Sequence, residues 1–345
     1  MTPALAWAEP GIEAVAERVY RVPLPLPERG MRAVNCYIVD GDAGITVIDP
    51  GWAWEPAFQG LAAALQSLGR TDADIERILV THHHPDHYPH AVHLRRLTGA
   101  PILVGAHEAE SIAQLGDPSA PLAPGVRGLL DRAGAGRIAR QLDAVARPAG
   151  IGEWFERPDG LLLGEEQFAA AEVRIDVVAT PGHTSGHLAF VVADSSVIIT
   201  GDHLLAHITP SIGFETNPRR DALAQFLGSL RLIDRYRDFR ALPAHGPSMN
   251  EPAVRARELL AHHDQRLAEI LQTVQTGAAR VLDIAGRLRW TRRGRPFDGL
   301  DGRHQMLALI ETSVHAAHLA DEGMLREDRR GEEIWYSPTN EHRGV

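Results

Sequence analysis

Residues 81–87, with the sequence THHHPDH, constrain this chain more than any other segment. They follow a strand expected over 75–80, whose apolar run 78–80 indicates that it is buried and carries the histidines at its carboxyl end. Because side chains alternate along an extended backbone, His82 and His84 point to one side and His83 to the other. Imidazole nitrogens and carboxylate oxygens are ligands of zinc and similar ions, so we predict a metal site rather than a histidine-rich surface turn.

The same segment turns into a helix. Asp86 and His87 lie at this turn, where they can reach a second position beside that of His82 and His84. We expect the helix to run over 91–97, with Pro89 in its first turn and Gly99 as its stop. Ligands at the carboxyl ends of strands are typical of layered α/β folds.

Three more metal-ligand residue types each follow a β-rich run and are flanked by glycine or proline. His183 lies in the sequence PGHTSGH at 181–187, Asp202 lies in GDH at 201–203, and His245 lies in AHG at 244–246. The preceding runs predict strands over 173–179, 197–200 and 240–243, with a further strand over 189–192. This repeated placement after strands is a second strong indication of a metal site.

In this order, the motifs resemble those of the metallo-β-lactamase fold superfamily, over about residues 15–250. The resemblance implies an α/β fold, the four-layer αββα sandwich of two similar halves, with a two-metal site where the sheet ends meet. His82, His84 and His183 would hold the first ion, Asp86, His87 and His245 would hold the second, and Asp202 would bridge both. An aspartate at position 202 is unlike the main zinc β-lactamases and similar to the thioesterase, lactonase and nuclease branches.

The ligand set suits two divalent metal ions, with zinc as our first expectation and iron or manganese as alternatives. A water shared by two such ions loses a proton near neutral pH and becomes a hydroxide nucleophile. Asp86 is the candidate catalytic residue, because its second carboxylate oxygen could orient that nucleophile and take its proton. We expect three residues to orient the ligands, namely Asp49, Thr81 and His187. The other histidines, including His83, are expected not to bind metal.

The expected substrate contacts are aromatic. Tyr88 stands where many family members have a small residue, so we expect it beside the metal loop at the entrance. Residues 105–160 form a long irregular segment with two expected helices, 108–115 and 128–146. A segment of this length usually covers a site or forms an interface. Trp154 and Phe155 within it are candidates for apolar substrate contact, against the alternative that they pin the segment to the protein body.

Residues 251–345 follow the last motif and predict a separate domain after a catalytic domain at 1–250. We expect helices over 251–276, 281–288 and 304–319 and then a hairpin over 322–336. This order is similar to the winged-helix tail of the lactamase-β-like branch, which includes an endoribonuclease. The tail has 14 arginines against 15 acidic residues, and its one basic cluster (Arg287, Arg289, Arg292, Arg293, Arg295, around Trp290) is local. Nucleic-acid modules are clearly basic, so packing on the catalytic domain or forming a homodimer is favoured over RNA binding.

Composition excludes several other classes. The single cysteine, Cys36, excludes a disulfide framework and a thiolate-rich metal site, and the absence of lysine excludes Schiff-base chemistry. The net charge of −10 disfavours general nucleic-acid affinity. The chain lacks an apolar run of membrane-spanning length and a secretion leader, so we expect a cytoplasmic protein without membrane contact.

These features favour a dinuclear metal-dependent hydrolase that cleaves a small acyl substrate, namely a thioester, an ester or a lactone, with a metal-bridging hydroxide. The alternative is a metal-dependent endoribonuclease or phosphodiesterase of the lactamase-β-like branch. A third hypothesis is a non-catalytic or redox protein on the same fold, although no segment of the sequence predicts an electron-delivering domain. Metal-quantified protein tested on thioesters, lactones, phosphodiesters and RNA would separate the three.

Overall fold

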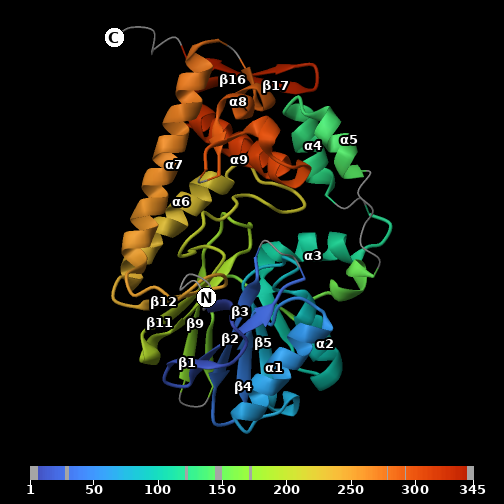
Figure 1. Ribbon diagram of the computed structural model, residues 1–345, viewed down its shortest axis with the longest axis vertical. Coiled ribbons are helices and arrows are strands. Elements are labelled where there is room, and N and C mark those ends of the chain that lie inside the picture. Colours follow the sequence, from blue (N-terminus) through green and yellow to red (C-terminus); the bar gives the residue numbers. More distant parts are fainter. Residues whose placement is uncertain are drawn as a thin grey trace.

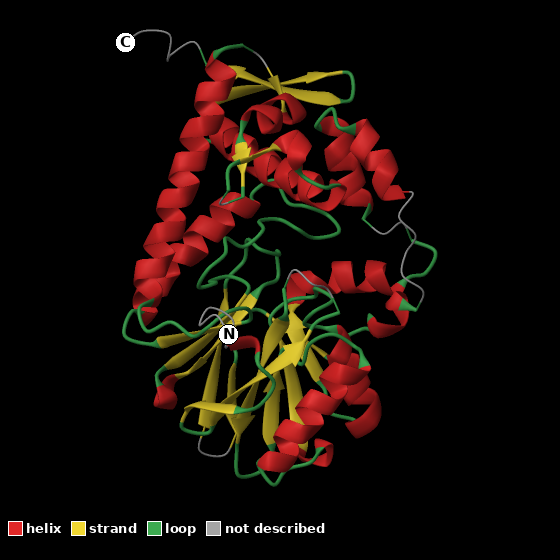
Figure 2. Ribbon diagram, viewed as in Figure 1, coloured by secondary structure: helices red, strands yellow, loops and turns green. Residues whose placement is uncertain are grey.

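The computed structural model describes residues 7–27, 31–120, 123–143, 150–170, 173–277, 279–291 and 293–339. Two β-sheets pack face to face with helices on their outer faces, and a smaller, mainly helical unit lies at one end of this sandwich (Figures 1 and 2). This architecture confirms the predicted α/β sandwich with a helical C-terminal region. No described helix is both long enough and apolar enough to cross a membrane.

The first sheet is built from the N-terminal half of the chain. Its neighbouring strands follow one another in sequence order, and the four strands β4 to β7 pair in parallel. The carboxyl ends of these four strands therefore share one edge of the sheet. The described strands are β1 (Glu13–Ala16), β2 (Val19–Pro25), β3 (Ala33–Asp40), β4 (Ile45–Ile48), β5 (Ile75–Val80), β6 (Ile102–Gly105) and β7 (Gly160–Leu162), and the covering helices are α1 (Glu55–Ser67) and α2 (Pro89–Thr98).

Two prolines lie inside β2, although proline lacks the backbone N–H that a central strand normally donates. Pro23 and Pro25 belong to β2, which lies between β1 and β3 in the sheet order. However, β1 pairs only with residues 19–21, so the prolines lie where β2 has a partner on the β3 side alone. A missing N–H is tolerated at such a locally unpaired edge.

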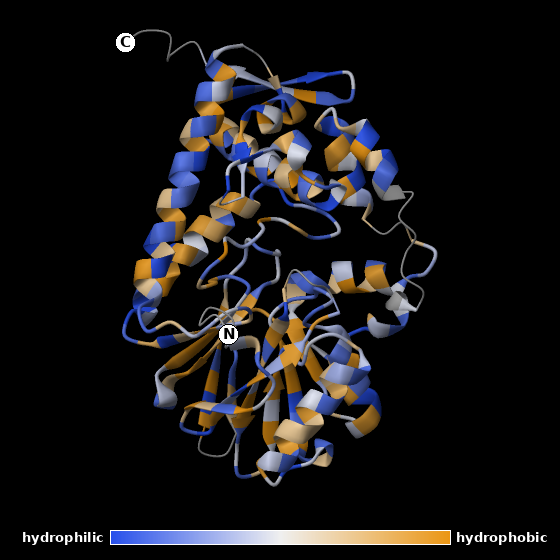
Figure 3. Ribbon diagram, in the orientation of Figure 1, coloured by the Kyte–Doolittle hydropathy of each residue, from blue (hydrophilic) through white to orange (hydrophobic). Residues whose placement is uncertain are grey.

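The second sheet has the order β12-β11-β10-β9-β8. Apolar side chains from the facing strands of both sheets, among them Tyr37, Leu79 and Phe190, fill the space between the sheets, and Figure 3 shows how apolar residues concentrate along these strands. The strands are β8 (Gln167–Ala170), β9 (Val173–Ala179), β10 (Leu188–Val192), β11 (Val197–Gly201) and β12 (Arg240–Pro243), with α6 (Ala222–Leu232) and α7 (Pro252–Gln275) following in sequence.

The remaining elements come from the 105–160 segment and the tail. The helix predicted over 128–146 is wrong: two helices, α4 and α5, meet at a turn where Gly134 has a φ of 78°. A left-handed backbone at this position ends α4, and glycine adopts it without a steric penalty. The elements are α3 (Ala109–Gly116), α4 (Pro124–Arg132), α5 (Gly136–Asp143), β13 (Ala279–Arg280), α8 (Val281–Arg287), β14 (Arg289–Trp290), β15 (Arg295–Pro296), α9 (Gly302–Asp321), β16 (Leu325–Arg330) and β17 (Glu333–Pro338).

Helices α4 and α5 share one hydrophobic cluster with the tail. Val126, Leu130 and Ile138 pack with Ile270 and Leu309 in this cluster. In contrast, Ile112 of α3 packs in the core of the first half of the sandwich. The segment predicted as one covering insert is therefore divided between two hydrophobic cores.

Candidate metal centre

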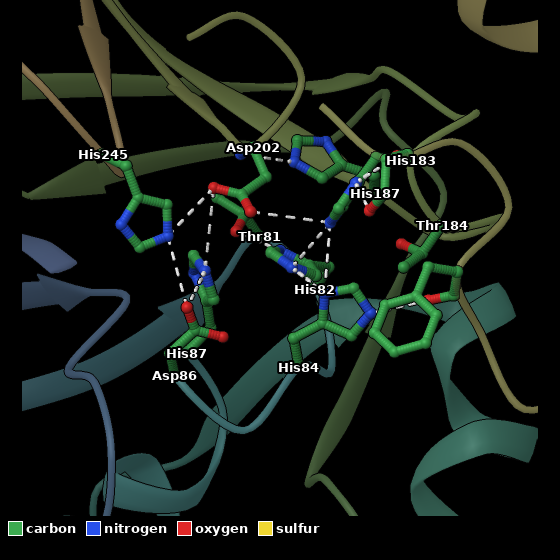
Figure 4. A network of polar contacts seen from close by, with 12 residues as sticks. Thr81, His82, His84, Asp86, His87, His183, Thr184, His187, Asp202 and His245 are labelled. Carbon is green, nitrogen blue, oxygen red and sulfur yellow. Dashed lines mark hydrogen bonds and ion pairs between the residues drawn. The ribbon is translucent and has the colours of Figure 1, made fainter. Parts of the chain in front are cut away.

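Four loops that follow strands bring the seven predicted metal ligands together (Figure 4). The loop after β5 carries His82, His84, Asp86 and His87, and the loop between β9 and β10 carries His183. Asp202 follows β11 and His245 follows β12, which are parallel neighbours in the second sheet. The ligands are buried: the most exposed of them, His84 and Asp86, are each 9% accessible.

The first group consists of three imidazoles. His82 Nε2 lies 2.9 Å from His84 Nδ1, and His183 Nε2 lies 3.2 Å from His82 Nε2 and 3.1 Å from His84 Nδ1. Nitrogens bonded to one zinc ion at about 2.0–2.1 Å in a tetrahedral site lie about 3.3 Å apart. The three nitrogens therefore have nearly the mutual spacing that a shared ion requires.

The second group lies beside the first. His245 Nε2 lies 3.2 Å from Asp86 Oδ2, and His87 Nε2 lies 3.8 Å from the same oxygen. Asp202 faces both groups: its Oδ1 lies 3.4 Å from His245 Nε2 and 3.9 Å from His87 Nε2, whereas its Oδ2 lies 3.6 Å from His183 Nε2. One carboxylate thus presents one oxygen to each group of ligands.

A polar partner holds the other ring nitrogen of each imidazole. His84 Nε2 donates to the Phe214 carbonyl, His183 Nδ1 to the Ser211 carbonyl and His245 Nδ1 to the Ala33 carbonyl, at 2.6, 2.6 and 2.8 Å. These bonds fix the tautomer, so the nitrogen that faces the centre keeps its lone pair.

Asp49 supports the two remaining ligand imidazoles of the 81–87 loop: His82 through the Thr81 hydroxyl, and His87 directly. The Thr81 hydroxyl donates to Asp49 Oδ2 at 2.7 Å and can therefore accept from His82 Nδ1 at 3.0 Å. His87 Nδ1 lies 3.0 Å from the same Asp49 oxygen. His187 acts on a different ligand, because its Nε2 accepts from the backbone N–H of Asp202 at 3.1 Å. Asp49, Thr81 and His187 thus each contact a predicted metal-ligand residue.

Electrostatics differ between the two groups. Burial lowers the pKa of His84 to about 3, of His183 to about 4 and of His82 well below its usual range, so these imidazoles are neutral at pH 7. Burial opposes charge on His87 as well, but the carboxylates Asp49, Asp86 and Asp202 outweigh it and raise its pKa to about 10. The metal-free second group therefore holds a proton that the first group does not.

Several of the predicted metal-ligand atoms have no hydrogen-bond partner within the described part of the protein, as expected of atoms that bind metal ions. Among the described residues, His87 Nε2, His245 Nε2 and Asp202 Oδ1 are buried without a hydrogen-bond partner. Such atoms are costly to bury unless something binds them. A divalent cation in each group would bind these atoms and offset the two carboxylates.

The three aromatic residues expected to contact substrate pack against the body of the protein. Tyr88 is fully buried at the start of α2, where its hydroxyl donates to the Glu156 carbonyl at 2.6 Å and its ring stacks on Phe155. Phe155 is itself a buried core residue, and Trp154 packs against the same core beneath the Arg96 guanidinium. Tyr88 therefore fastens the insert to the body instead of narrowing the entrance, and Trp154 and Phe155 make the packing contacts that the alternative role describes.

Sequence reasoning missed the segment 203–221 between β11 and α6. This loop supplies the Ser211 and Phe214 carbonyls, and the half-buried Phe214 ring lies 5.2 Å from that of His84. Backbone carbonyls carry no residue signature, so no motif could indicate this role. Phe214 also packs against the cluster that α4 and α5 share with the tail, which places the ring between the metal ligands and that cluster.

Comparisons with known proteins agree with this geometry. The family model described as Metallo-beta-lactamase superfamily matches residues 29–245. A solved metallo-beta-lactamase family protein from Thermus thermophilus superposes with a TM-score of 0.74 at 26% identity, covering 94% of this chain and 100% of that one. The beta-lactamase-like protein 2 homolog of Caenorhabditis elegans is 24% identical over 79% of this chain and 76% of its own length. A hydroxyacylglutathione hydrolase of Albidiferax ferrireducens is 29% identical over 56% of this chain and 54% of its own length.

Proposed function

Because this chain belongs to the metallo-beta-lactamase superfamily and is a metal-dependent hydrolase, we propose that it binds two divalent ions and cleaves a small acyl substrate. The substrate class is a thioester, an ester or a lactone. The observation that carries the proposal is the placement of Asp202, whose two oxygens face the two groups of imidazoles separately. A carboxylate placed between two sets of imidazole nitrogens would suit a pair of zinc ions, with iron or manganese as alternatives.

The protein groups divide the work. His82, His84 and His183 would hold the first ion, and Asp86, His87 and His245 would hold the second. Two such ions, when bound, would activate a water molecule and polarise the substrate carbonyl. His87 and His245 hold the pKa of Asp86 well below its usual range against the effect of burial. An ionised Asp86, with its Oδ2 facing these imidazoles, could orient the attacking water through its other carboxylate oxygen, which is the role expected of it.

Charge supports an acyl substrate over RNA. The tail has a net charge near −1, and Arg280 is paired with Asp283 and Glu333. Trp290 is buried and donates to the Ala285 carbonyl, so it offers no face on which a base could stack. Arg292 of the predicted basic cluster lies outside the described residues. The name of the Albidiferax relative describes hydrolysis of a hydroxyacylglutathione, a thioester, which also favours the acyl class.

Replacing Asp202 tests the proposal. Asp202→Ala removes the group that faces both ligand sets, so we expect loss of at least one equivalent of metal and a fall in activity of about 10²-fold or more. Elemental analysis and a panel of thioesters, lactones, phosphodiesters and RNA give the two readouts. Unchanged metal content would refute the site, and chelator-sensitive cleavage of RNA alone would favour the endoribonuclease alternative.

A further inference from the structure

Glu108 lies just after β6, outside every motif of the metal site, and is fully buried. We infer that Glu108 is a positioning residue for the first ion, because its carboxylate fastens the loop of His82 and His84 to the loop of His183. The inference rests on the proposed two-ion site. It assigns a role to a residue that touches no predicted ligand directly.

The two carboxylate oxygens of Glu108 serve different loops. Oε2 accepts from the backbone N–H of His83 at 2.9 Å and makes a closer contact with the His83 ring at Nδ1. Oε1 accepts from the Thr184 hydroxyl and from the Gly186 backbone N–H, both at 2.7 Å. His83 lies between two ligands of the first ion, and Thr184 follows the third ligand directly.

The same junction is tight at the backbone. A β-carbon on Gly105 would lie 1.8 Å from the Gly186 carbonyl oxygen, and one on Gly186 would lie 2.6 Å from Glu108 N. Both glycines are thus required by close approach of the chain segments. The segment of Glu108 is thus packed directly on the loop of His183, and from there its carboxylate reaches the backbone of His83.

The Glu108 carboxylate stays charged although it is buried. Burial disfavours its charge, but His83 and the hydrogen bonds to Thr184 and the backbone hold its pKa at about 2. Breaking these bonds would let the loops separate, and His183 Nε2 would lose its spacing from the other two nitrogens. The second group takes His245 from the segment after β12 and Asp86 and His87 from the turn before α2. It therefore depends less on the contacts of Glu108.

Metal binding to single groups tests the inference. In full-length protein, a His245→Ala background isolates the first group and a His84→Ala background isolates the second. Co²⁺ titration against a chromophoric chelator, with the visible Co²⁺ spectrum as a second readout, then measures each affinity. Glu108→Gln keeps the side-chain volume but replaces one carboxylate oxygen, which accepts two bonds, with an NH2 group that can only donate. We therefore expect the affinity of the first group for Co²⁺ to fall about 10- to 100-fold and that of the second group to change less than threefold.

Two further variants keep the test decisive. Thr184→Val removes one bond to Glu108, so a loss of about 2- to 10-fold at the first group alone is expected. Thr312→Val removes a buried hydroxyl in α9, which donates to the Ala308 carbonyl at 2.7 Å, and serves as the matched destabilised control with no effect on either group. Equal weakening of both groups by Glu108→Gln, or none, would overturn the inference while leaving the proposed function intact. A wild-type chain that binds no metal would overturn both.

Discussion

Each imidazole around the candidate metal centre has one ring nitrogen in contact with a polar group of the protein, but these polar groups differ in charge. His84 and His183 are tied to neutral carbonyl groups, whereas His87 lies against the Asp49 carboxylate. A carbonyl fixes the tautomer without adding charge, and a carboxylate also stabilises the imidazolium. The two ligand groups should therefore respond differently to protons.

We predict that metal affinity depends on pH at the second group only. Because the pKa of His87 is raised to about 10, a metal ion must displace its proton, and affinity should rise with pH by up to about tenfold per unit between pH 6 and 8. His84 and His183 have pKa values of about 3 and 4, so first-group affinity should stay flat over that range.

Co²⁺ titrations at several pH values, in the single-group backgrounds described above, measure this difference. His84→Ala reports on the second group and His245→Ala on the first. Equal slopes for the two groups would contradict the prediction.

At the scale of single residues, the sequence predicted the positions where metal binding needs a particular side chain. The order of the histidine and aspartate motifs indicated which side chains meet, and the structure brings them together. Glu108 was not recognisable, because it lies 25 positions from His83 and a single glutamate in a loop has no distinguishing pattern. The Ser211 and Phe214 carbonyls were equally hidden, since any residue can supply a carbonyl.

At the scale of elements, hydrophobic periodicity located strands and helices well where packing agrees with it. The strands β5, β9 and β12 and the tail helices α7, α8 and α9 lie within about two residues of their predicted ranges. The failure has a local cause: Gly134 divides the predicted helix 128–146. This cause is not visible in a hydrophobic pattern alone.

Helices α7 and α9 meet at a buried histidine pair, and we predict that this contact makes the fold acid-sensitive. His263 Nδ1 lies 3.0 Å from His315 Nε2, with Arg266 and Glu311 beside them. Burial lowers the pKa of His263 to about 2 and of His315 to about 3. Both rings stay neutral in the folded state and gain protons on unfolding below about pH 6.5. Their contribution is therefore complete above pH 6.5 and is lost as the pH falls from 6.5 towards 3.

The free energy of unfolding of the metal-free protein should drop by about 2 kcal/mol between pH 7.5 and 5.5 from this pair. Denaturant titrations at the two pH values measure it. A variant with His263→Gln and His315→Gln is less stable at both pH values but should show a shallower pH dependence. An identical pH dependence in the variant and the wild type would disprove the role of the pair.

At the scale of the molecule, the tail is bound to the catalytic half by burial more than by charge. Arg220, at the end of the 203–221 loop, pairs with Asp321 and Glu327 of the tail. These ion pairs are largely exposed, and such pairs contribute about 0–1 kcal/mol each. The shared cluster of α4, α5, α7 and α9 is larger, and at about 25 cal/mol per Å² of buried apolar surface it dominates the attachment.

We predict that the two domains expected from the sequence do not separate at residue 250. A chain ending there would expose Val126, Leu130 and Ile138, and would leave Phe214 without the cluster on which it packs. The 203–221 loop then loses support for the carbonyls that hold His84 and His183. Expression of residues 1–250 should give aggregated protein, or soluble protein with at least tenfold weaker first-group Co²⁺ affinity. A soluble fragment that binds both ions as the full chain does would show that the boundary is real.

The shared cluster also sets an order of events during synthesis. Helices α4 and α5 leave the ribosome early, but their partners in α9 and β17 come more than 150 residues later. At a synthesis rate of about 5–20 residues per second, the apolar faces of α4 and α5 remain uncovered by α9 and β17 for roughly 10 seconds or more. The first half of the sandwich can complete its own sheet during this interval. A chaperone that binds nascent chains should therefore associate with residues 123–143 until the tail has been made.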